Sequence, residues 1–361
     1  MTLSPSIQEQ ISRARTDLRM GVPVVLDKGE TALIIPAETL SDERLKDLRQ
    51  MIGEMLLVLS AKRARTLKLA AYDGDLARVF VPLQANTGWV RAMADPSSDL
   101  QTPLKGPFES KRNGDTVLER FALNLVKSAH LLPTALIKYI SQPNATNLKG
   151  LTRLNVTAAS PYLSAAAILS GITSAKLPIS ATPKGKLHVF RPDNGAEEHY
   201  AMEINKPERR KPVLVRLHSA CFTGDVLGSL KCDCGAQLHG ALQLMGQNDG
   251  GVLLYLNQEG RGIGMANKMR AYSLQDEGFD TVEANHRLGF EDDERDFRIG
   301  ASILKDMRIR DIRLMTNNPT KILMMERNGI NVHERVPLIL GENSTNAHYL
   351  STKARKSGHL L

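Results

Sequence analysis

Apolar and polar positions alternate most regularly in the second half of the chain. Three short apolar runs there are predicted as strands, at residues 213–217, 251–256 and 312–316. Residues 235–246 carry apolar side chains at the i, i+3, i+4, i+7 spacing of an amphipathic helix, namely Leu238, Ala241, Leu242 and Met245. A further helix is predicted to start after Asn318 and Pro319 and to end at Gly329. Strands that alternate with helices predict an α/β arrangement.

The first half has a less regular pattern. Residues 21–27 and 31–38 are predicted as paired strands around a turn at Lys28 and Gly29. Residues 41–56 are predicted as a helix capped by Ser41. Residues 160–185 end a helix and lead into a connection that contains proline and glycine, which places a domain boundary near Ala175.

These patterns predict a mixed α/β (α+β) fold in two domains, residues 1–175 and 176–361, each a mixed sheet with flanking helices. The composition agrees, because 361 residues suffice for about two domains, and 42% hydrophobic with 24% charged residues is ordinary for a globular protein. The N-terminal residues lack the apolar segment of a signal peptide, and the apolar runs are too short to cross a bilayer. We expect a soluble, cytoplasmic protein with no membrane partner.

The formal net charge of +8 favours polyanionic partners in general, including nucleotide phosphates. Nucleic-acid binding is the weakest hypothesis, because no block of consecutive Lys and Arg residues resembles a nucleic-acid tail and only 4% of the residues are aromatic and able to stack on bases.

All three cysteines of the chain lie in one short stretch, as Cys221, Cys232 and Cys234. In a reducing compartment such a cluster indicates metal binding or catalysis rather than disulfides. Three thiolates suit Zn²⁺, and three protein ligands with an open fourth position describe a catalytic zinc. Two alternatives remain: a structural site closed by His218 or His239, and a cluster of buried thiols without metal.

A glycine-rich stretch, QEGRGIGM at residues 258–265, directly follows the predicted strand 251–256. Its glycines let backbone amides approach an anion, and the N-terminus of the next helix would favour negative charge there. The stretch matches neither of the common nucleotide-binding loops, and a simple turn after a buried strand explains it equally well.

Three further groups of residues have both a functional and a structural interpretation. The next helix carries Met265, Met269 and Tyr272 on one face; we interpret the methionines as a core stripe and the Tyr272 hydroxyl as a candidate site group. The acidic run 291–294 is typical of a solvated face, yet Asp293 and Arg295 suit a proton acceptor and a phosphate-binding cation. Residues 316–321 suit either a phosphate or ribose contact or helix capping.

Taken together, four stretches of the second half resemble the GTP cyclohydrolase II family: VRLHSACFTGDVLGSLKCDCGAQL, LYLNQEGRGIGMANKMRAYSLQDEGFDTVEANHRLGFEDDERDF, LMTNNPTK and VPLILGENSTNAHYLSTKARKSGHLL. This family opens the imidazole ring of GTP and releases formate and pyrophosphate. The resemblance therefore implies formation of 2,5-diamino-6-(5-phosphoribosylamino)pyrimidin-4(3H)-one for riboflavin biosynthesis. It also implies a homodimer.

The resemblance assigns roles residue by residue. Cys221, Cys232 and Cys234 would hold one Zn²⁺ that activates water for attack on C8 of the purine, and Mg²⁺ would accompany the triphosphate. The GTP-binding residues would be Arg216, His218, Ser219, Gln237, Glu259, Gly260, Arg261, Thr281, Thr316 and Lys321. We further infer that Glu259 accepts hydrogen bonds from the guanine edge.

The catalytic residues implied by the resemblance are Asp293 as proton acceptor, Arg295 as nucleophile on the α-phosphorus, and Tyr272 near the reacting ring. Because a guanidinium is nearly always protonated, Arg295 is an equally good candidate for a charge clamp on the phosphoryl group. One position departs from the family pattern: Ala220 stands where the family commonly has glutamate before the first cysteine.

The first half resembles a degenerate 3,4-dihydroxy-2-butanone 4-phosphate synthase domain. It keeps the strand–turn–strand outline of that family, but of the acidic, Mg²⁺-binding run only Asp27 and Glu30 are nearby. We predict that this half lacks synthase activity and serves dimerisation, stability or regulation. For the whole chain, the alternatives to a GTP cyclohydrolase II are a ring-opening hydrolase for another nucleotide or base and a non-catalytic zinc- or nucleotide-binding module.

Overall fold

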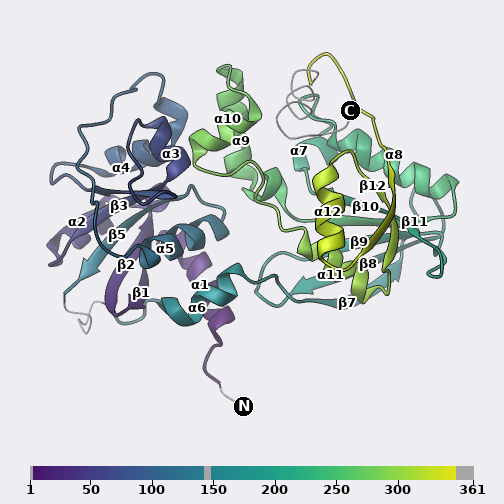
Figure 1. The fold of residues 1–361 in the computed structure, drawn as a ribbon, viewed down its shortest axis with the longest axis horizontal. Coiled ribbons are helices and arrows are strands. Elements are labelled where there is room, and N and C mark those ends of the chain that lie inside the picture. The colour runs from purple at the N-terminus through teal and green to yellow at the C-terminus, as the bar shows by residue number, and fades with distance from the viewer. Residues whose placement is uncertain (1–2, 142–147, 347–361) are drawn as a thin grey trace. The chain divides into compact units, whose positions relative to one another are not determined.

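The structure, a computed structural model, describes residues 3–141 and 148–346. The chain divides into two compact units. The first comprises Met1–Ala165 and Ile263–Glu294, and the second comprises Ala166–Gly262 and Arg295–Leu361. Figure 1 shows the chain with most of its helices and strands labelled.

This division differs from the predicted domains, 1–175 and 176–361, in two respects. The strand β7 (Leu169–Lys176) spans the predicted boundary at Ala175 and pairs with β8 (Gly185–Pro192), so it belongs to the sheet of the second unit. Residues 263–294 belong to the first unit because their apolar side chains enter its core. The domain limits of the sequence analysis stay a prediction.

The first unit contains a mixed sheet whose strands lie in the order β4-β3-β5-β2-β1-β6. Its strands are β1 (Val24–Lys28), β2 (Glu30–Pro36), β3 (Met55–Ser60), β4 (Leu76–Phe80), β5 (Thr134–Ile140) and β6 (Arg153–Asn155). Neighbouring strands are antiparallel, except that β6 runs parallel to β1.

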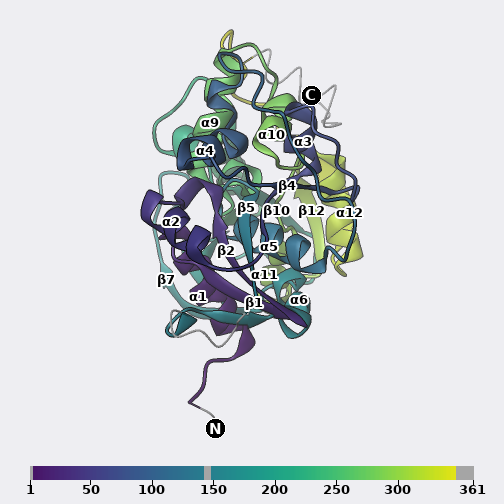
Figure 2. The same ribbon diagram turned by 90° about the vertical axis from the view of Figure 1, so that its left-hand side faces the viewer.

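Both faces of this sheet are covered by helices (Figure 2). Successive strand residues enter opposite cores: Val24 and Leu26 pack on one face and Val25 on the other, as the two-residue period of a strand requires. One face packs on α1 (Ile7–Arg19), α5 (Val117–Ser128) and α6 (Val156–Ser164). The other packs on α2 (Asp42–Gln50), α3 (Ala61–Thr66), α4 (Thr87–Ala94), α9 (Met265–Asp276) and α10 (Thr281–Leu288).

The second unit contains a mixed sheet in the order β13-β12-β10-β11-β9-β8-β7. Besides β7 and β8, its strands are β9 (His199–Ile204), β10 (Val213–Ser219), β11 (Gly251–Leu256), β12 (Asp311–Met315) and β13 (Asn331–Val336). The strands β13, β12, β10 and β11 are parallel, whereas β9, β8 and β7 continue the sheet antiparallel. One face packs on α11 (Arg298–Asp306) and α12 (Pro319–Arg327), and the other packs on α8 (Cys234–Gln247).

The structure confirms the predicted mixed α/β fold and most of the predicted elements. The strand 251–256 coincides with β11, and β1 and β2 pair around the predicted turn at Gly29. Ser41 caps α2 by accepting the backbone N–H of Arg44 (3.3 Å).

Three predictions about these elements are wrong. The helix predicted for residues 41–56 ends at Gln50, because Gly53 has a φ of 133° and the apolar run that follows forms β3. The connection predicted within residues 160–185 contains β7. Met269 is 39% exposed and is no core residue, because α9 buries Ala271 and Leu274 instead.

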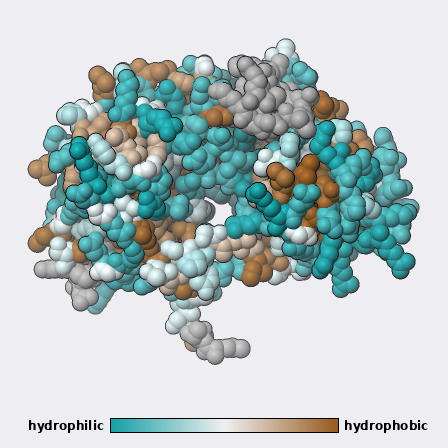
Figure 3. Space-filling view, in the orientation of Figure 1, coloured by the Kyte–Doolittle hydropathy of each residue, from teal (hydrophilic) through white to brown (hydrophobic). Residues whose placement is uncertain are grey.

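Among residues 3–141 and 148–346, no helix is both long and apolar enough to cross a membrane. The face of the molecule in Figure 3 is mainly hydrophilic, and hydrophobic residues form scattered groups on it.

Candidate functional site

The candidate site of the second unit lies where three adjacent parallel strands end. The strands β12, β10 and β11 are neighbours and run in the same direction, so their carboxyl ends meet at one edge of the sheet. Ligand sites of open α/β sheets form at this edge. Here the chain continues into Cys221 after β10, into Glu259 after β11 and into Thr316 after β12.

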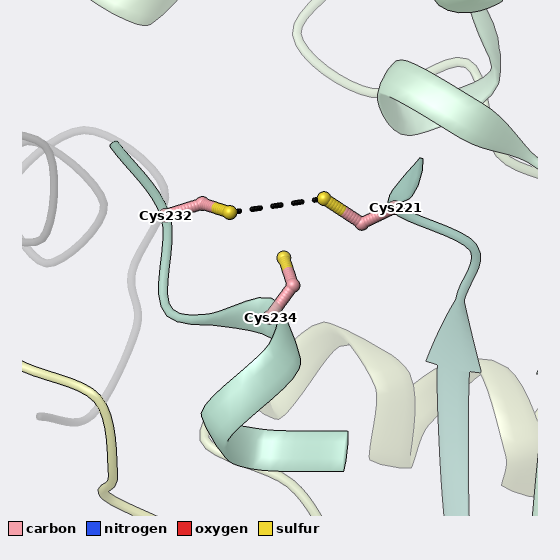
Figure 4. A group of neighbouring side chains, drawn as sticks. All are labelled: Cys221, Cys232 and Cys234. Carbon is pink, nitrogen blue, oxygen red and sulfur yellow. Dashed lines mark hydrogen bonds between the residues drawn. The ribbon is translucent and has the colours of Figure 1, made fainter. Parts of the chain in front are cut away.

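The three cysteine side chains converge at this edge. Cys221 precedes the short helix α7 (Phe222–Asp225), and Cys234 is the first residue of α8. Figure 4 shows the sulfur atoms of Cys221, Cys232 and Cys234 directed toward one another. All three lie within 4.8 Å of one another, and the sulfurs of Cys221 and Cys232 are 3.8 Å apart. Tetrahedral zinc with Zn–S bonds of about 2.3 Å separates its sulfurs by about 3.8 Å, so the cluster fits such an ion.

Two glycines allow this convergence. A Cβ atom on Gly224 would lie 2.6 Å from the sulfur of Cys232 and 3.2 Å from that of Cys221. A Cβ atom on Gly235 would lie 2.2 Å from the carbonyl oxygen of Gly224. Any larger residue at either position would therefore push α7 away from α8 and separate the thiols.

Neither histidine named as a possible fourth ligand belongs to the cluster. His218 bonds through Nε2 to Asp225 (3.0 Å), and His239 Nδ1 lies 2.8 Å from the carbonyl oxygen of Gly235. Within residues 3–141 and 148–346, no histidine, aspartate or glutamate joins the three thiols to make a group of four. The described residues thus offer three thiol ligands.

The thiols also affect one another electrostatically. The hydrogen bond to Cys221, together with burial, raises the pKa of the Cys232 thiol above its usual value. Since a metal ion binds the thiolate, metal binding at this cluster is coupled to the release of protons.

Asp225 holds the turn that carries Cys221. Its buried carboxylate accepts the backbone N–H of Cys221 (3.0 Å), the Nε2–H of His218 (3.0 Å) and the hydroxyl of Tyr255 (2.9 Å). The rings of His218 and Tyr255 stack with centroids 5.5 Å apart. Burial lowers the pKa of His218, and burial raises the pKa of Tyr255, so both side chains are neutral donors to the carboxylate. Neither Asp225 nor Tyr255 was among the predicted site residues. The one available signal was the place of Asp225 one helical turn after Cys221.

Arg216 lies on β10 in a chain of polar side chains. It donates to the carbonyl oxygen of Met315 (3.2 Å) and to Oε1 of Gln237, whose Nε2 donates in turn to Asp233 (2.6 Å). Burial lowers the pKa of Arg216 to about 10, which leaves it protonated at neutral pH. Its Nε is buried without a hydrogen-bond partner among the described residues, and such a donor is consistent with a ligand-binding role.

Two further predicted site residues place positive charge at the same edge. Lys321 donates from Nζ to the carbonyl oxygen of Leu217 (3.0 Å), and Arg295 donates from Nη1 to Oγ of Ser219 (3.2 Å). The ring of Phe297 lies beside both cations, 4.9 Å from the Arg295 guanidinium carbon and 5.5 Å from Lys321 Nζ. Thr316 accepts the backbone N–H of Asn318 (3.1 Å), and Asn318 in turn caps α12 by accepting the backbone N–H of Thr320 (2.9 Å).

The glycine-rich turn contacts the cysteine segment through Glu259. Its Oε2 accepts the backbone N–H of Phe222 (2.7 Å), directly after Cys221. Gly260 and Arg261 both have left-handed φ angles, 64° and 61°. For a residue other than glycine this conformation costs about 1–2 kcal/mol, and strain of this kind is concentrated at functional sites.

Three predicted site residues belong to the first unit. Tyr272 lies on α9 with the Nζ of Lys268 5.7 Å from its ring centre, and Thr281 begins α10 and accepts from Nε2 of Gln275 (3.4 Å). Asp293 is exposed, between α10 and α11. The other predicted site residues all lie in the second unit.

Comparison with known proteins identifies the family to which this chain belongs. A family model described as GTP cyclohydrolase II matches residues 171–337. The GTP cyclohydrolase-2 of Azospirillum brasilense is 35% identical over 370 residues, and the alignment covers 100% of this chain and 96% of that relative. The chain belongs to the GTP cyclohydrolase II family. The family consists of hydrolases of riboflavin biosynthesis, and its name identifies GTP as the substrate.

Shorter members of the GTP cyclohydrolase II family align with about half of this chain. The GTP cyclohydrolase-2 of Proteus mirabilis is 53% identical over 195 residues, which cover 54% of this chain and 96% of that relative. That of Klebsiella pneumoniae subsp. pneumoniae is 51% identical with the same coverage. Nearly half of this chain therefore has no counterpart in these relatives.

Among solved structures, a two-domain 3,4-dihydroxy-2-butanone 4-phosphate synthase from A. baumannii aligns with 91% of this GTP cyclohydrolase II chain and 99% of its own length, at 15% identity and a TM-score of 0.32. The synthase of Candida albicans aligns with 43% of this chain and 97% of its own, at 18% identity and a TM-score of 0.33. TM-scores this low do not establish a shared fold, so the resemblance of the first half to the synthase family stays a prediction from its sequence.

Proposed function

We propose that this chain is a zinc-dependent GTP cyclohydrolase II. It opens the imidazole ring of GTP, releases formate and pyrophosphate, and leaves 2,5-diamino-6-(5-phosphoribosylamino)pyrimidin-4(3H)-one. The observation that carries this proposal is the convergence of three thiols, without a fourth ligand among the described residues, at the carboxyl edge of β10 and β11. Family membership supplies the reaction, and the thiol cluster fits the metal that the reaction needs.

The residues of the chain divide the chemistry among them. Cys221, Cys232 and Cys234 would hold a Zn²⁺ ion, which supplies Lewis-acid activation of water for attack on C8 of the purine. The Glu259 carboxylate is an acceptor suited to the N1–H and amino group of guanine, and its contact with Phe222 holds it next to the cysteine segment. We assign Asp293 as the proton acceptor.

We propose that the basic side chains of the site bind the phosphates of GTP. Arg216 and Lys321 supply charge at the site edge, and Arg295 clamps the phosphoryl group that is transferred. A protonated guanidinium is a poor nucleophile, so the clamp role is preferred for Arg295. Mg²⁺ would neutralise the remaining charge of the triphosphate. We also propose GTP contacts for the following residues: His218, Ser219, Gln237, Gly260, Arg261, Tyr272, Thr281 and Thr316.

Two parts of the proposal concern the whole chain. The first half has no synthase activity, because Asp27 is paired with Arg153 (2.9 Å) instead of belonging to a carboxylate cluster. Within residues 3–141 and 148–346, the thiol cluster is the only group of three or more His, Cys, Asp or Glu side chains close enough to share a metal ion. The active form is proposed to be a homodimer, as the family resemblance implies.

The test uses full-length protein with Zn²⁺, Mg²⁺ and GTP, and measures formate, pyrophosphate and the pyrimidine product. We expect all three from GTP and none from ATP or pyrimidine nucleotides. Replacing Cys232→Ser is expected to reduce formate release by more than about 100-fold, since even an indirect partner of a metal ligand is worth 10- to 100-fold.

The matched control is Ser174→Ala on the exposed strand β7, which should leave formate release unchanged. Zinc-loaded protein that leaves GTP intact would contradict the proposal. Preferential opening of another nucleotide would favour the alternative that Ala220 raises, a relative with a changed substrate.

A further inference from the structure

The α9–α10 helix pair is built into the core of the first unit. α10 packs on α3, which the view in Figure 2 also shows. The buried apolar side chains of residues 263–294 join a core formed by β1, β2, β3, β4 and β5 and the helices beside them. They are Ile263, Ala271, Leu274, Ala284, Leu288 and Phe290. Residues 1–165 therefore supply the hydrophobic surface on which this helix pair rests.

Charged contacts fix α9 on the same surface. The guanidinium of Arg270 donates from Nη2 to Glu38 (2.9 Å) and from Nε to Asp95 (3.1 Å). Glu38 is itself held, because its second oxygen accepts the backbone N–H of Leu132 (2.9 Å). The orientation of α9 thus depends on two carboxylates of the first half.

Two glycines bring the segment into close contact with the first half at both ends. Gly264 has a φ of 85°, and a Cβ atom on it would lie 3.0 Å from the Cβ of His130. Gly289 has a φ of 91°, and a Cβ atom on it would lie 2.8 Å from both Ser60 and Pro133. The carbonyl oxygen of Gly289 accepts the hydroxyl of Ser60 (2.7 Å). The backbone at both glycines thus packs so closely against the first half that a Cβ atom would not fit without a shift of its neighbours.

The acidic run 291–294, which contains Asp293, is held by ion pairs with the first half. Glu291 pairs with Lys62 (3.2 Å) and Glu294 pairs with Lys127 (2.6 Å). Both lysines belong to the first half of the chain. The residues on either side of the proposed proton acceptor are therefore anchored by that half.

The side chains of α9 that enter the core of the first unit do not include Tyr272. The buried positions of α9 are Asn267, Lys268, Ala271 and Leu274, of which Ala271 and Leu274 enter the first core; Met269 is 39% exposed and Tyr272 is half-buried. The first half thus packs on α9 through Ala271 and Leu274, and Tyr272 is not among the described side chains of that hydrophobic core.

We infer that the first half of this chain is a positioning scaffold that holds the α9–α10 segment in the conformation needed for GTP turnover. This inference rests on the proposed function, which assigns Tyr272, Thr281 and Asp293 to the reaction. It gives residues 1–165 a task that needs no active site of their own. The short relatives from Proteus and Klebsiella, which lack a counterpart to nearly half of this chain, must hold the corresponding residues by other means.

The test compares two charge-matched double variants of the full-length chain. Glu38→Gln with Asp95→Asn removes both carboxylates that hold Arg270. Glu54→Gln with Asp75→Asn removes the same number of charges from the same unit, at the ion pairs with Lys111 and Arg120. The measurements are amide hydrogen exchange of peptides spanning 265–288, kcat/KM for GTP, and bound zinc.

We expect the first double variant to exchange about tenfold faster across α9 and α10 and to lose about tenfold in kcat/KM, as the loss of two partly exposed ion pairs predicts. Its zinc content should equal that of the control, because the thiols lie outside the anchored segment. Glu38→Asp with Asp95→Glu, which keeps both negative charges beside Arg270, should recover part of the loss.

Equal exchange in the variant and the control would overturn the inference, as would faster exchange with unchanged GTP turnover. Absence of formate from the wild-type chain would overturn the proposed function and the link to GTP. The exchange comparison alone still decides whether the first half holds the helices.

Discussion

At the scale of single residues, Asp225 connects the cysteine segment to the sheet. Its carboxylate receives hydrogen bonds from the backbone of Cys221, from His218 on β10 and from Tyr255 on β11. A buried carboxylate is tolerated only when its oxygens are hydrogen-bonded in this way. Because the Cys221 N–H is one of the donors, the position of the Cys221 thiol depends on Asp225.

Replacing Asp225→Asn should weaken zinc binding, because the neutral amide replaces a charged acceptor of three hydrogen bonds and exposes an N–H₂ group to donors. We expect a loss of about 10- to 100-fold in zinc affinity, the range found for groups that orient metal ligands. The measurement is competition with a chromophoric chelator, together with the absorption bands of the Co²⁺-substituted protein, which report ligand geometry.

The matched control is Asp311→Asn at the far end of β12, where the carboxylate pairs with His333 on the exposed surface. It should leave both zinc affinity and the Co²⁺ spectrum unchanged. An Asp225→Asn protein with wild-type affinity would show that the cysteines are positioned without this carboxylate.

The site residues differ in how far the sequence could predict them. The cysteines could be predicted as site residues because thiols are rare in this chain and cluster in one stretch. Tyr255 could not be predicted, because a tyrosine in a strand is common and only the parallel pairing of β10 with β11 places it beside His218. For Asp225 the one signal was its place one helical turn after Cys221. The resemblance named Arg216, but the buried chain through Gln237 to Asp233 required the structure.

At the scale of elements, the hydrophobic pattern predicted those strands and helices whose period is undisturbed. β11 and the β1–β2 pair are examples, since each has turn residues at its ends. The pattern failed where two elements adjoin without a clear break, as between α2 and β3, where Gly53 separates them.

The orientation of α9 was another failure at this scale. Its methionines are spaced like a core stripe, but the face that includes Asn267 and Ala271 is buried. Asn267 can be buried because its Nδ2 donates to the carbonyl oxygens of His130 and Ile263, both at 2.9 Å. Periodicity alone cannot reveal a buried polar residue that is satisfied by a distant segment.

At the scale of the whole molecule, two sheets of different connectivity share one chain, and residues 263–294 belong to the core of the first although they follow β11 in the second. No local pattern contains that information, because the packing partners are more than 100 residues apart in the sequence, as Ser60 and Gly289 are. A division into two parts could therefore be predicted from the sequence. The packing of residues 263–294 into the core of the first unit could not.

The first half is predicted to have no activity on ribulose 5-phosphate. Asp27 is neutralised by Arg153 and also accepts the hydroxyl of Thr31 (2.7 Å), so it is not disposed to bind Mg²⁺. We expect full-length protein with ribulose 5-phosphate and Mg²⁺ to form no 3,4-dihydroxy-2-butanone 4-phosphate, while the same preparation releases formate from GTP. Formation of the butanone phosphate above the buffer background would contradict this expectation.

The proposed function requires the three thiols to bind one zinc ion and to leave a coordination position for solvent. Zinc K-edge X-ray absorption on the full-length, zinc-loaded protein tests it most directly. We expect three sulfur neighbours at about 2.3 Å and one oxygen neighbour at about 2.0–2.2 Å, with one zinc per chain. A fourth sulfur, or the multiple-scattering pattern of a bound imidazole, would contradict it, because a closed shell would make this zinc structural.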